Sequence, residues 1–294
     1  MKKIITLTAS LFSPLLFANS IQTYQTSDWI TDKVFTQGVE GPAVDKFGHL
    51  FAVNFEKEGT IGKVTAKDEA SLFITLPKGS TGNGIRFDNN NNMFIADYSG
   101  HNILKVNSNT NQAFVFAHNK KMNQPNDIAI MKTGTLFASD PNWVKSTGQL
   151  WRIDTNGLTH LIESDMGTTN GIEVSADQKR LYVNESVQRK VWVYDIQLDN
   201  TLKNKRLLIE FADFGLDGMR VDIKGNLYIA RYGKGVIAKV SPQGKLLSEI
   251  KLKGQYPTNV AFGGKDGNQI FVTMQKRGAI ETFFAQYPGS SQFN

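Results

Sequence analysis

The sequence predicts an all-β fold, a six-bladed β-propeller, from three observations. A short phrase recurs six times at steps of 42 to 47 residues, and a turn and a second apolar strand follow each copy. No stretch of useful length shows the 3.6-residue apolar period of a helix. Units of about 43 residues made of short strands are typical of propeller blades, whereas solenoid rungs are shorter. The six phrases begin at Glu40, Asn83, Asn126, Asn170, Asp217 and Asn259.

Each repeat unit reads as an antiparallel sheet. The phrase forms the first strand, and the second strands are expected at 50–54, 93–97, 136–140, 181–185, 227–231 and 270–274. The loops between these two strands are rich in Gly, Asn and Asp, which tolerate positive φ. Third strands are expected at 62–64, 103–106, 150–153, 191–194 and 236–240. Fourth strands are expected at 71–76, 113–117, 159–162 and 246–250.

The last unit, residues 258–284, lacks a fourth strand. Residues 29–35 precede the first unit and have no hairpin partner of their own, so we expect them to supply that outer strand. Such a closure removes exposed sheet edges. The prediction is therefore a single propeller domain over residues 21–294, closed by an N-terminal strand.

Residues 1–20 resemble a cleavable signal peptide. Lys2 and Lys3 precede an apolar stretch over 4–17, and small residues follow up to Ser20, where cleavage is expected. The apolar stretch is short for a membrane span, although an uncleaved anchor is the alternative, and no later segment is long and apolar enough. We therefore predict a periplasmic or secreted protein. The chain has no cysteine, so no disulfide contributes to its stability.

The charge distribution argues against some partners. The chain has 33 basic and 27 acidic residues, a formal charge of +6, and its lysines and arginines are scattered. Nucleic-acid binders concentrate such residues on one stripe, so we expect no nucleic-acid partner. We expect a monomer.

One channel mouth is predicted to be rich in oxygen ligands. The innermost strands of a propeller line the channel and run the same way, so the first residues of the six phrases meet at one mouth. An Asn at a strand start also caps turns, which is the alternative role for Asn83 and Asn259. The acids Glu40 and Asp217 would repel each other unless a cation or a proton lies between them. The set suits calcium, or less well magnesium or manganese, and the four scattered histidines do not suggest zinc.

The phrases beginning at Glu40, Asn126, Asn170 and Asp217 resemble those of the SMP-30/gluconolactonase (regucalcin-like) family, over about residues 34–284. The resemblance implies a six-bladed propeller that holds one divalent metal, usually calcium, and hydrolyses lactones. It implies that Glu40, Asn170 and Asp217 are metal ligands and that Asn126 is a ligand or a substrate contact. One departure concerns the substrate. Gln124 stands where sugar-lactonase members commonly have an Arg, which argues against sugar acid lactones.

The predicted function is metal-dependent hydrolysis of a small-molecule lactone or related ester. The metal would polarise the carbonyl, and Asp217 would be the general base or the nucleophile. No G-x-S-x-G elbow, P-loop or dinucleotide fingerprint occurs. Because second strands end at the same mouth, the candidate substrate-binding residues are Asn126, Tyr98, Asp140, Trp143, Glu185 and Arg231. The alternative is a non-enzymatic propeller that binds a ligand or protein partner and keeps a structural metal.

Overall fold

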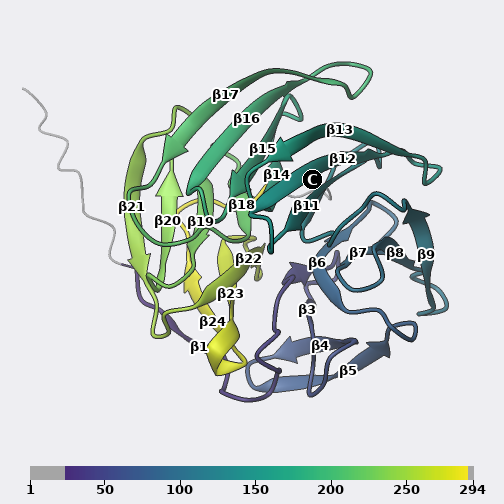
Figure 1. Ribbon diagram of the computed structural model, residues 1–294. Helices are drawn as coiled ribbons and strands as arrows, with labels where there is room; N and C mark the ends of the chain where they lie inside the picture. Colours follow the sequence, from purple (N-terminus) through teal and green to yellow (C-terminus); the bar gives the residue numbers. More distant parts are fainter. Residues whose placement is uncertain (1–23, 291–294) are drawn as a thin grey trace, which may run out of the picture.

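The predicted propeller is confirmed. A computed structural model describes residues 24–290, and these form six four-stranded antiparallel sheets arranged as a ring (Figure 1). The predicted signal peptide, residues 1–20, lies outside the described residues. The only helix among the described residues is the 3-10 turn Gln275–Arg277, so the expected scarcity of helix is also confirmed. Within the same residues, no helix is long and apolar enough to cross a membrane.

Each blade runs from the channel outward in chain order. Blade 1 comprises β2 (Ala43–Val44), β3 (Leu50–Val53), β4 (Thr60–Ala66) and β5 (Glu69–Thr75). Blade 2 comprises β6 (Gly82–Phe87), β7 (Met93–Asp97), β8 (Asn102–Val106) and β9 (Ala113–His118). Blade 3 comprises β10 (Ile128–Ile130), β11 (Leu136–Asn142), β12 (Thr147–Ile153) and β13 (Thr159–Met166).

The second half of the ring repeats this order. Blade 4 comprises β14 (Thr169–Val174), β15 (Arg180–Glu185), β16 (Lys190–Ile196) and β17 (Leu202–Glu210). Blade 5 comprises β18 (Met219–Val221), β19 (Leu227–Arg231), β20 (Val236–Val240) and β21 (Leu246–Lys251). Blade 6 comprises β22 (Pro257–Gly263), β23 (Gln269–Met274), β24 (Ala279–Phe284) and the N-terminal β1 (Ser27–Ile30).

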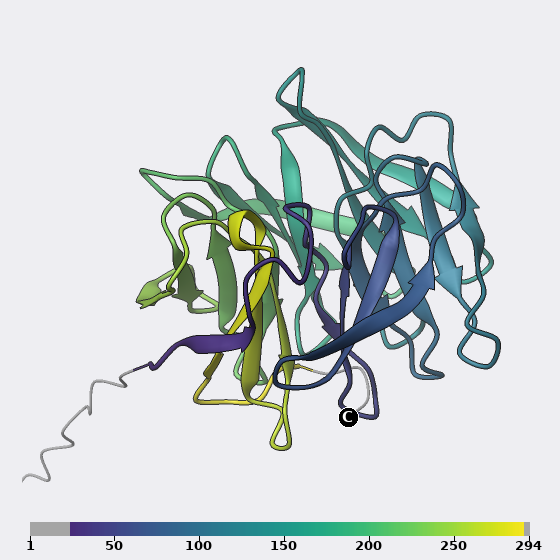
Figure 2. The same cartoon turned by 90° about the horizontal axis from the view of Figure 1, so that it is seen from below.

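The N-terminal strand closes the ring, but it begins earlier than predicted. β1 pairs antiparallel with β24 and lies beside it in both views (Figures 1 and 2). It covers Ser27–Ile30 rather than 29–35, because the chain turns at Lys33, whose φ is +68°, and leaves blade 6. Phe35 then forms a bridge with Phe55 in blade 1. Asp28 on β1 accepts ion pairs from Arg277 (2.9 Å) and Lys253 (2.6 Å), which fix the closure.

The loops between the first two strands of each blade have the predicted turn chemistry. Every one contains a residue with positive φ: Gly48, Asn91, Gly134, Gln178, Gly225 and Gly267. The sequence did not indicate a fourth strand for blade 4. Its β17 is nine residues long, but most of its side chains are exposed and several are basic, so it lacks the apolar alternation of a strand.

The hydrophobic core is divided among the blade interfaces. Six clusters of buried residues each join two neighbouring blades, and the one containing Ile30 and Ile280 joins the last blade to the first. The innermost strands approach closely, and four of the six phrases have glycine at the second position, whereas Asp127 and Val260 occupy it in the other two. A Cβ on Gly218 would lie 1.9 Å from Cγ of Asn259. This close packing holds the first residues of neighbouring phrases around one narrow channel mouth.

Candidate metal centre and active site

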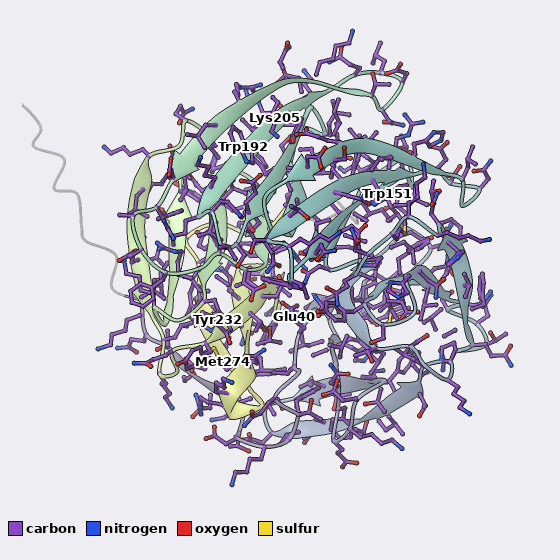
Figure 3. The ribbon with its side chains drawn as sticks, viewed as in Figure 1. Glu40, Trp151, Trp192, Lys205, Tyr232 and Met274 are labelled. Carbon is purple, nitrogen blue, oxygen red and sulfur yellow. The ribbon has the colours of Figure 1, made fainter. Side chains whose placement is uncertain are left out.

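The predicted ligands meet at one mouth of the channel. Glu40, Asn126, Asn170 and Asp217 line the same cavity of about 440 Å³, and Glu40 lies near the centre of the ring (Figure 3). Main-chain pairing fixes Glu40, Asn126 and Asp217 just before their strands begin, whereas Asn170 is the second residue of β14. For example, the amide of Asn126 donates to Ser139 O (2.9 Å), and that of Asp217 donates to Ala230 O (2.9 Å). The phrase therefore places one polar side chain per blade at a defined height in the channel.

Two of these side chains carry buried oxygens without partners. Oδ1 of Asn126 and Oδ1 of Asn170 are buried and accept no hydrogen bond, and the two residues are only 6% and 2% exposed. An unsatisfied buried polar group costs about 1–3 kcal/mol, so such groups are rare unless a ligand uses them. Asn126 and Asn170 line the cavity that also holds the two acids, so the four side chains together could bind a cation.

Burial makes ionisation of the Glu40 and Asp217 carboxyl groups unfavourable. Burial, followed by the nearby Asp127 carboxylate, raises the pKa of Glu40 to about 7. Burial and then the charge of Glu40 raise the pKa of Asp217 well above its usual range. The amides of Gly41 and Asn259 donate to Oε2 of Glu40, the latter over 3.1 Å, and only partly offset this effect. Without a cation the pair therefore retains a proton near neutral pH.

This donor set fits a hard divalent cation. Two carboxylates and two amide carbonyls supply oxygen ligands only, which calcium prefers and zinc does not. In the part of the chain that the structure describes, no group of three or more His, Cys, Asp or Glu side chains is placed to hold a metal. A site here therefore depends on the two asparagines as much as on the acids.

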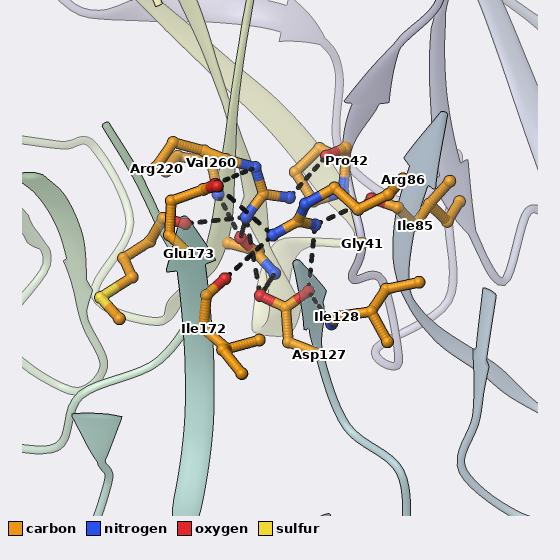
Figure 4. A network of polar contacts seen from close by, with 12 residues as sticks. Gly41, Pro42, Ile85, Arg86, Asp127, Ile128, Ile172, Glu173, Arg220 and Val260 are labelled. Carbon is orange, nitrogen blue, oxygen red and sulfur yellow. Dashed lines mark hydrogen bonds and ion pairs between the residues drawn. The ribbon is translucent and has the colours of Figure 1, made fainter. Parts of the chain in front are cut away.

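A second polar layer lies directly beneath this mouth, and it is internally paired (Figure 4). Arg86 Nη1 contacts Asp127 Oδ1 (3.1 Å), and its Nη2 lies 3.7 Å from Glu173 Oε2. Arg220 lies 3.6 Å from the same Asp127 and 3.7 Å from the same Glu173. Burial, together with Arg86, lowers the pKa of Arg220 to about 10, so it stays charged at neutral pH.

This ion-paired layer, defined as Arg86, Asp127, Glu173 and Arg220, was not among the predicted features. Its signal is visible in the phrases, because these charged residues occupy second and fourth positions where the other phrases have glycine or an apolar residue. Arg86, Glu173 and Arg220 also line a cavity of about 800 Å³ at the opposite mouth. The two cavities share no lining residue, so the ion-paired layer separates the two mouths.

Asn259 joins the two layers. Its Nδ2 donates to Glu40 Oε2 (3.1 Å) and to Asp127 Oδ2 (3.4 Å), while its Oδ1 accepts from Arg220 Nη1 (3.2 Å). Asn83 has a simpler role, because its Nδ2 donates to the main-chain oxygen of Asn126 (2.9 Å). Both asparagines therefore make contacts between blades, which differ from the turn capping given as their alternative role.

The predicted substrate-binding residues divide into two groups. Asn126, Tyr98 and Trp143 line the cavity. Asp140, Glu185 and Arg231 do not line it, because hydrogen bonds and ion pairs hold their side chains within the blades, and we assign them structural roles.

The partners of these three residues show why. Asp140 accepts hydrogen bonds from the amides of Asn123 and Gln124 and from the indole of Trp151 (2.9 Å). Glu185 accepts from the amide of Gly167 (2.8 Å). Arg231 is fully buried, pairs with Asp213 (2.8 Å) and stacks on Phe211 (3.9 Å to the ring centre).

Other residues also line the cavity: Tyr232, which its place at the end of a second strand predicts to lie near this mouth, and Gln275, Ser186 and Glu58, which were not among the predicted site residues. The Tyr232 hydroxyl donates to Gln275 Oε1 (2.6 Å), and both line the wall formed by blades 5 and 6. Ser186 and Glu58 complete other parts of the wall. Tyr232 and Ser186 directly follow the second strands of their blades, which is a usable signal, whereas Glu58 lies in an outer hairpin loop and gives none.

Comparisons with known proteins agree with this architecture. The family model described as "SMP-30/Gluconolactonase/LRE-like region" matches residues 39–276. A gluconolactonase of Zymomonas mobilis is 28% identical over 274 residues, covering 81% of this chain and 76% of the relative. A pentonolactonase of Haloferax volcanii is 30% identical, and the match spans about half of each chain, 50% and 52%.

Solved structures share the fold. A calcium-binding protein, regucalcin, from Agrobacterium tumefaciens has a TM-score of 0.77 at 18% identity, covering 91% of this chain and 96% of that one. A gluconolactonase from Xanthomonas campestris has a TM-score of 0.76 at 18% identity, covering 89% of both chains. The relatives named lactonases agree with the sequence-based prediction of a lactone hydrolase. With most of its length matched by one family model, the chain belongs to the SMP-30/gluconolactonase/LRE-like family.

Proposed function

We propose that this protein is an exported, metal-dependent hydrolase of lactones or related esters. The observation that carries the proposal is the combination of two buried acids with raised pKa values and two unpartnered amide oxygens in one cavity. Relatives named gluconolactonase and pentonolactonase support the reaction class. The regucalcin-like neighbour described as calcium-binding supports the choice of calcium.

Glu40, Asn126, Asn170 and Asp217 would hold the cation. When bound, it would supply Lewis-acid polarisation of the substrate carbonyl and stabilise the developing oxyanion. The fit is also electrostatic. With all groups ionised, the carboxylates of Glu40, Asp217, Asp127 and Glu173 and the two guanidiniums beneath them leave a net charge of −2, which one divalent cation neutralises.

Asp217 is the group that moves a proton or attacks. Its raised pKa makes the carboxylate a stronger base than an exposed aspartate, as a general base toward water requires. The same carboxylate can instead attack the carbonyl directly. Single turnover in ¹⁸O-labelled water identifies the nucleophilic route when the label enters the Asp217 side chain, because this requires a mixed anhydride that water opens at the Asp217 carboxyl carbon. Tyr98 and Trp143 would form walls for the substrate.

The test is hydrolysis of a substrate panel by the mature protein, with calcium and after chelation. The panel contains gluconolactone, short and long aliphatic lactones, phenyl acetate and a phosphotriester. We expect calcium-dependent turnover that falls at least about a thousandfold in Asp217→Asn, the scale typical of losing an essential base or nucleophile. Metal binding without any turnover would instead favour a ligand-binding propeller with a structural metal.

Export and oligomeric state are tested separately. We propose that cleavage near Ser20 releases a monomer into the periplasm or the medium. N-terminal sequencing of the protein from a periplasmic fraction should begin at about Ile21, and light scattering should give a monomer mass. An uncleaved chain in the membrane fraction would contradict this part of the proposal.

A further inference from the structure

The rim of the active-site cavity carries one acid that the proposed mechanism does not use. We propose that this residue, Glu58, is a specificity-determining residue that favours lactones or esters bearing a positively charged group over anionic ones. The inference rests on the proposed function, since it concerns the substrate of that same cavity.

Glu58 lines the cavity, and a hydrogen bond orients its exposed carboxylate. It lies in the loop between β3 and β4, and its Oε1 accepts a hydrogen bond from the Thr36 hydroxyl (2.7 Å). A Cβ on Gly38 would lie 2.8 Å from that oxygen, so the carboxylate rests directly on the Gly38 backbone, two residues before Glu40. The Asn54 amide pins the same segment by donating to Gly38 O (2.7 Å). The acid is thereby held beside the chain that leads to the metal ligands.

No cation compensates Glu58. Among the described residues, no Lys, Arg or His side chain lies within ion-pair distance of it, and none lines the cavity. Lys57 directly precedes Glu58 in the chain but forms no ion pair with it, and Lys276, which follows the lining residue Gln275, has its Nζ 5.9 Å from the ring centre of Tyr256. The ring of Tyr256 packs on that of the lining residue Tyr232, with 5.2 Å between the ring centres. Tyr256 therefore contacts both Lys276 and the cavity wall. An anionic substituent would therefore meet no basic side chain among the residues that line the cavity.

The remaining walls suit a cation. Tyr98, Trp143 and Tyr232 reach the cavity from three different blades. The face of an aromatic ring attracts a cationic group, and Trp does so best. A divalent ion between Glu40 and Asp217 would neutralise those two acids and leave Glu58 as the uncompensated charge. A substrate cation would then lie between the Glu58 carboxylate and the rings, while its carbonyl reaches the metal site.

The test compares three esters whose para position is unsubstituted, anionic or cationic: phenyl acetate, its para-carboxylate and its para-trimethylammonium derivative. We expect Glu58→Gln to lower the cationic-to-anionic ratio of kcat/KM about three- to tenfold, the scale of one exposed charge acting on both substrates at low salt. Comparing the variant with the wild type cancels differences in intrinsic ester reactivity. Glu69→Gln, an exposed acid on the outer strand of the same blade, is the matched control and should leave the ratio unchanged. Correspondingly substituted butyrolactones replace the esters if only lactones are hydrolysed.

A second readout does not need turnover. Titration with phenyltrimethylammonium should quench tryptophan fluorescence through Trp143, and Glu58→Gln should weaken this binding, whereas benzenesulfonate should bind poorly to both proteins. An unchanged kcat/KM ratio in an active Glu58→Gln variant would overturn this inference and leave the proposed function standing. Failure to hydrolyse any ester or lactone would contradict the proposed function itself.

Discussion

The channel contains two polar layers built from the same repeated phrase, and they solve the problem of buried charge in opposite ways. In the ion-paired layer, Arg86 and Arg220 face Asp127 and Glu173, so each charge has a partner. In the mouth layer above it, Glu40 and Asp217 face each other and two amide oxygens have no donor. Asn259 contacts both layers.

The difference separates structural polarity from functional polarity. A buried ion pair adds little net stability, but breaking it is costly because a charge is left alone. A buried cluster of acids without cationic partners lowers the stability of the ligand-free fold. Binding of a cation to the cluster offsets this loss. From this comparison we infer that the ion-paired layer has a structural role and that the mouth layer serves binding and catalysis.

Stability measurements on one variant from each layer should show the largest contrast. Arg86→Met removes one guanidinium facing Asp127 and Glu173, and we expect a loss of about 3–5 kcal/mol. Asp217→Asn removes a repulsive charge from the mouth, so the metal-free protein should lose no stability and should lose its stabilisation by calcium. Urea unfolding in EDTA measures both effects. Equal destabilisation by the two variants would erase the distinction between the layers.

The junction between the layers can be disturbed through Gly218. A methyl group there would lie 1.9 Å from Asn259 Cγ, so Gly218→Ala should cost about 1–3 kcal/mol and displace Asn259 from Glu40. Calcium affinity should fall with it. Gly215→Ala is the matched control, because its nearest neighbour would be 3.4 Å from the added Cβ. Normal calcium binding by Gly218→Ala would show that Asn259 does not orient Glu40.

The pH dependence of stability should reverse when calcium is added. The pKa of Glu40 is raised from 4.5 to about 7 in the metal-free fold, so the folded state binds the proton more tightly than the unfolded chain. Its stabilising contribution is therefore complete below about pH 4.5 and is lost as the pH rises to about 7. Calcium binding requires the ionised form, so calcium affinity should rise over the same range. Thermal melts in EDTA and in calcium give the two slopes, and Glu40→Gln should flatten the first. A metal-free stability that increases through this window would contradict the raised pKa.

The smallest effect is expected at the cavity wall. Trp143→Ala removes a partly exposed ring, and we expect KM to rise about three- to tenfold while kcat and calcium affinity stay unchanged. Asp140→Asn should behave differently. It weakens the hydrogen bonds to the amides of Asn123 and Gln124 and should lower the melting temperature before it affects KM. Steady-state kinetics and melting curves on both variants distinguish a wall residue from a structural one.

The six-bladed ring could be predicted from the sequence, because a turn signal follows each copy of the repeated phrase. Residues tolerating positive φ stand between the first two strands of all six blades, from Gly48 to Gly267. The sequence was not sufficient to predict β17, whose basic, exposed residues show no apolar alternation. The position of the N-terminal strand was also shifted, because the turn at Lys33 depends on the packing of Phe35 against Phe55.

The sequence predicted which residues lie near the channel mouth, but not which of their side chains point into the cavity. The phrase starts correctly located Glu40, Asn126, Asn170 and Asp217 at one mouth. The ends of second strands also approach that mouth, but successive side chains on a strand point to opposite faces. Asp140, Glu185 and Arg231 therefore turn into the blades, and only their hydrogen-bond partners reveal this.

Calorimetric titration of calcium into the mature, EDTA-treated protein tests the central claim most directly. The mouth layer predicts one site per chain, with proton release near neutral pH and an affinity that is lost in Glu40→Gln and Asp217→Asn but retained in the wall variant Trp143→Ala. Absence of calcium binding by the wild type, or binding that survives in both acid variants, would contradict the assignment of these buried acids to a metal centre.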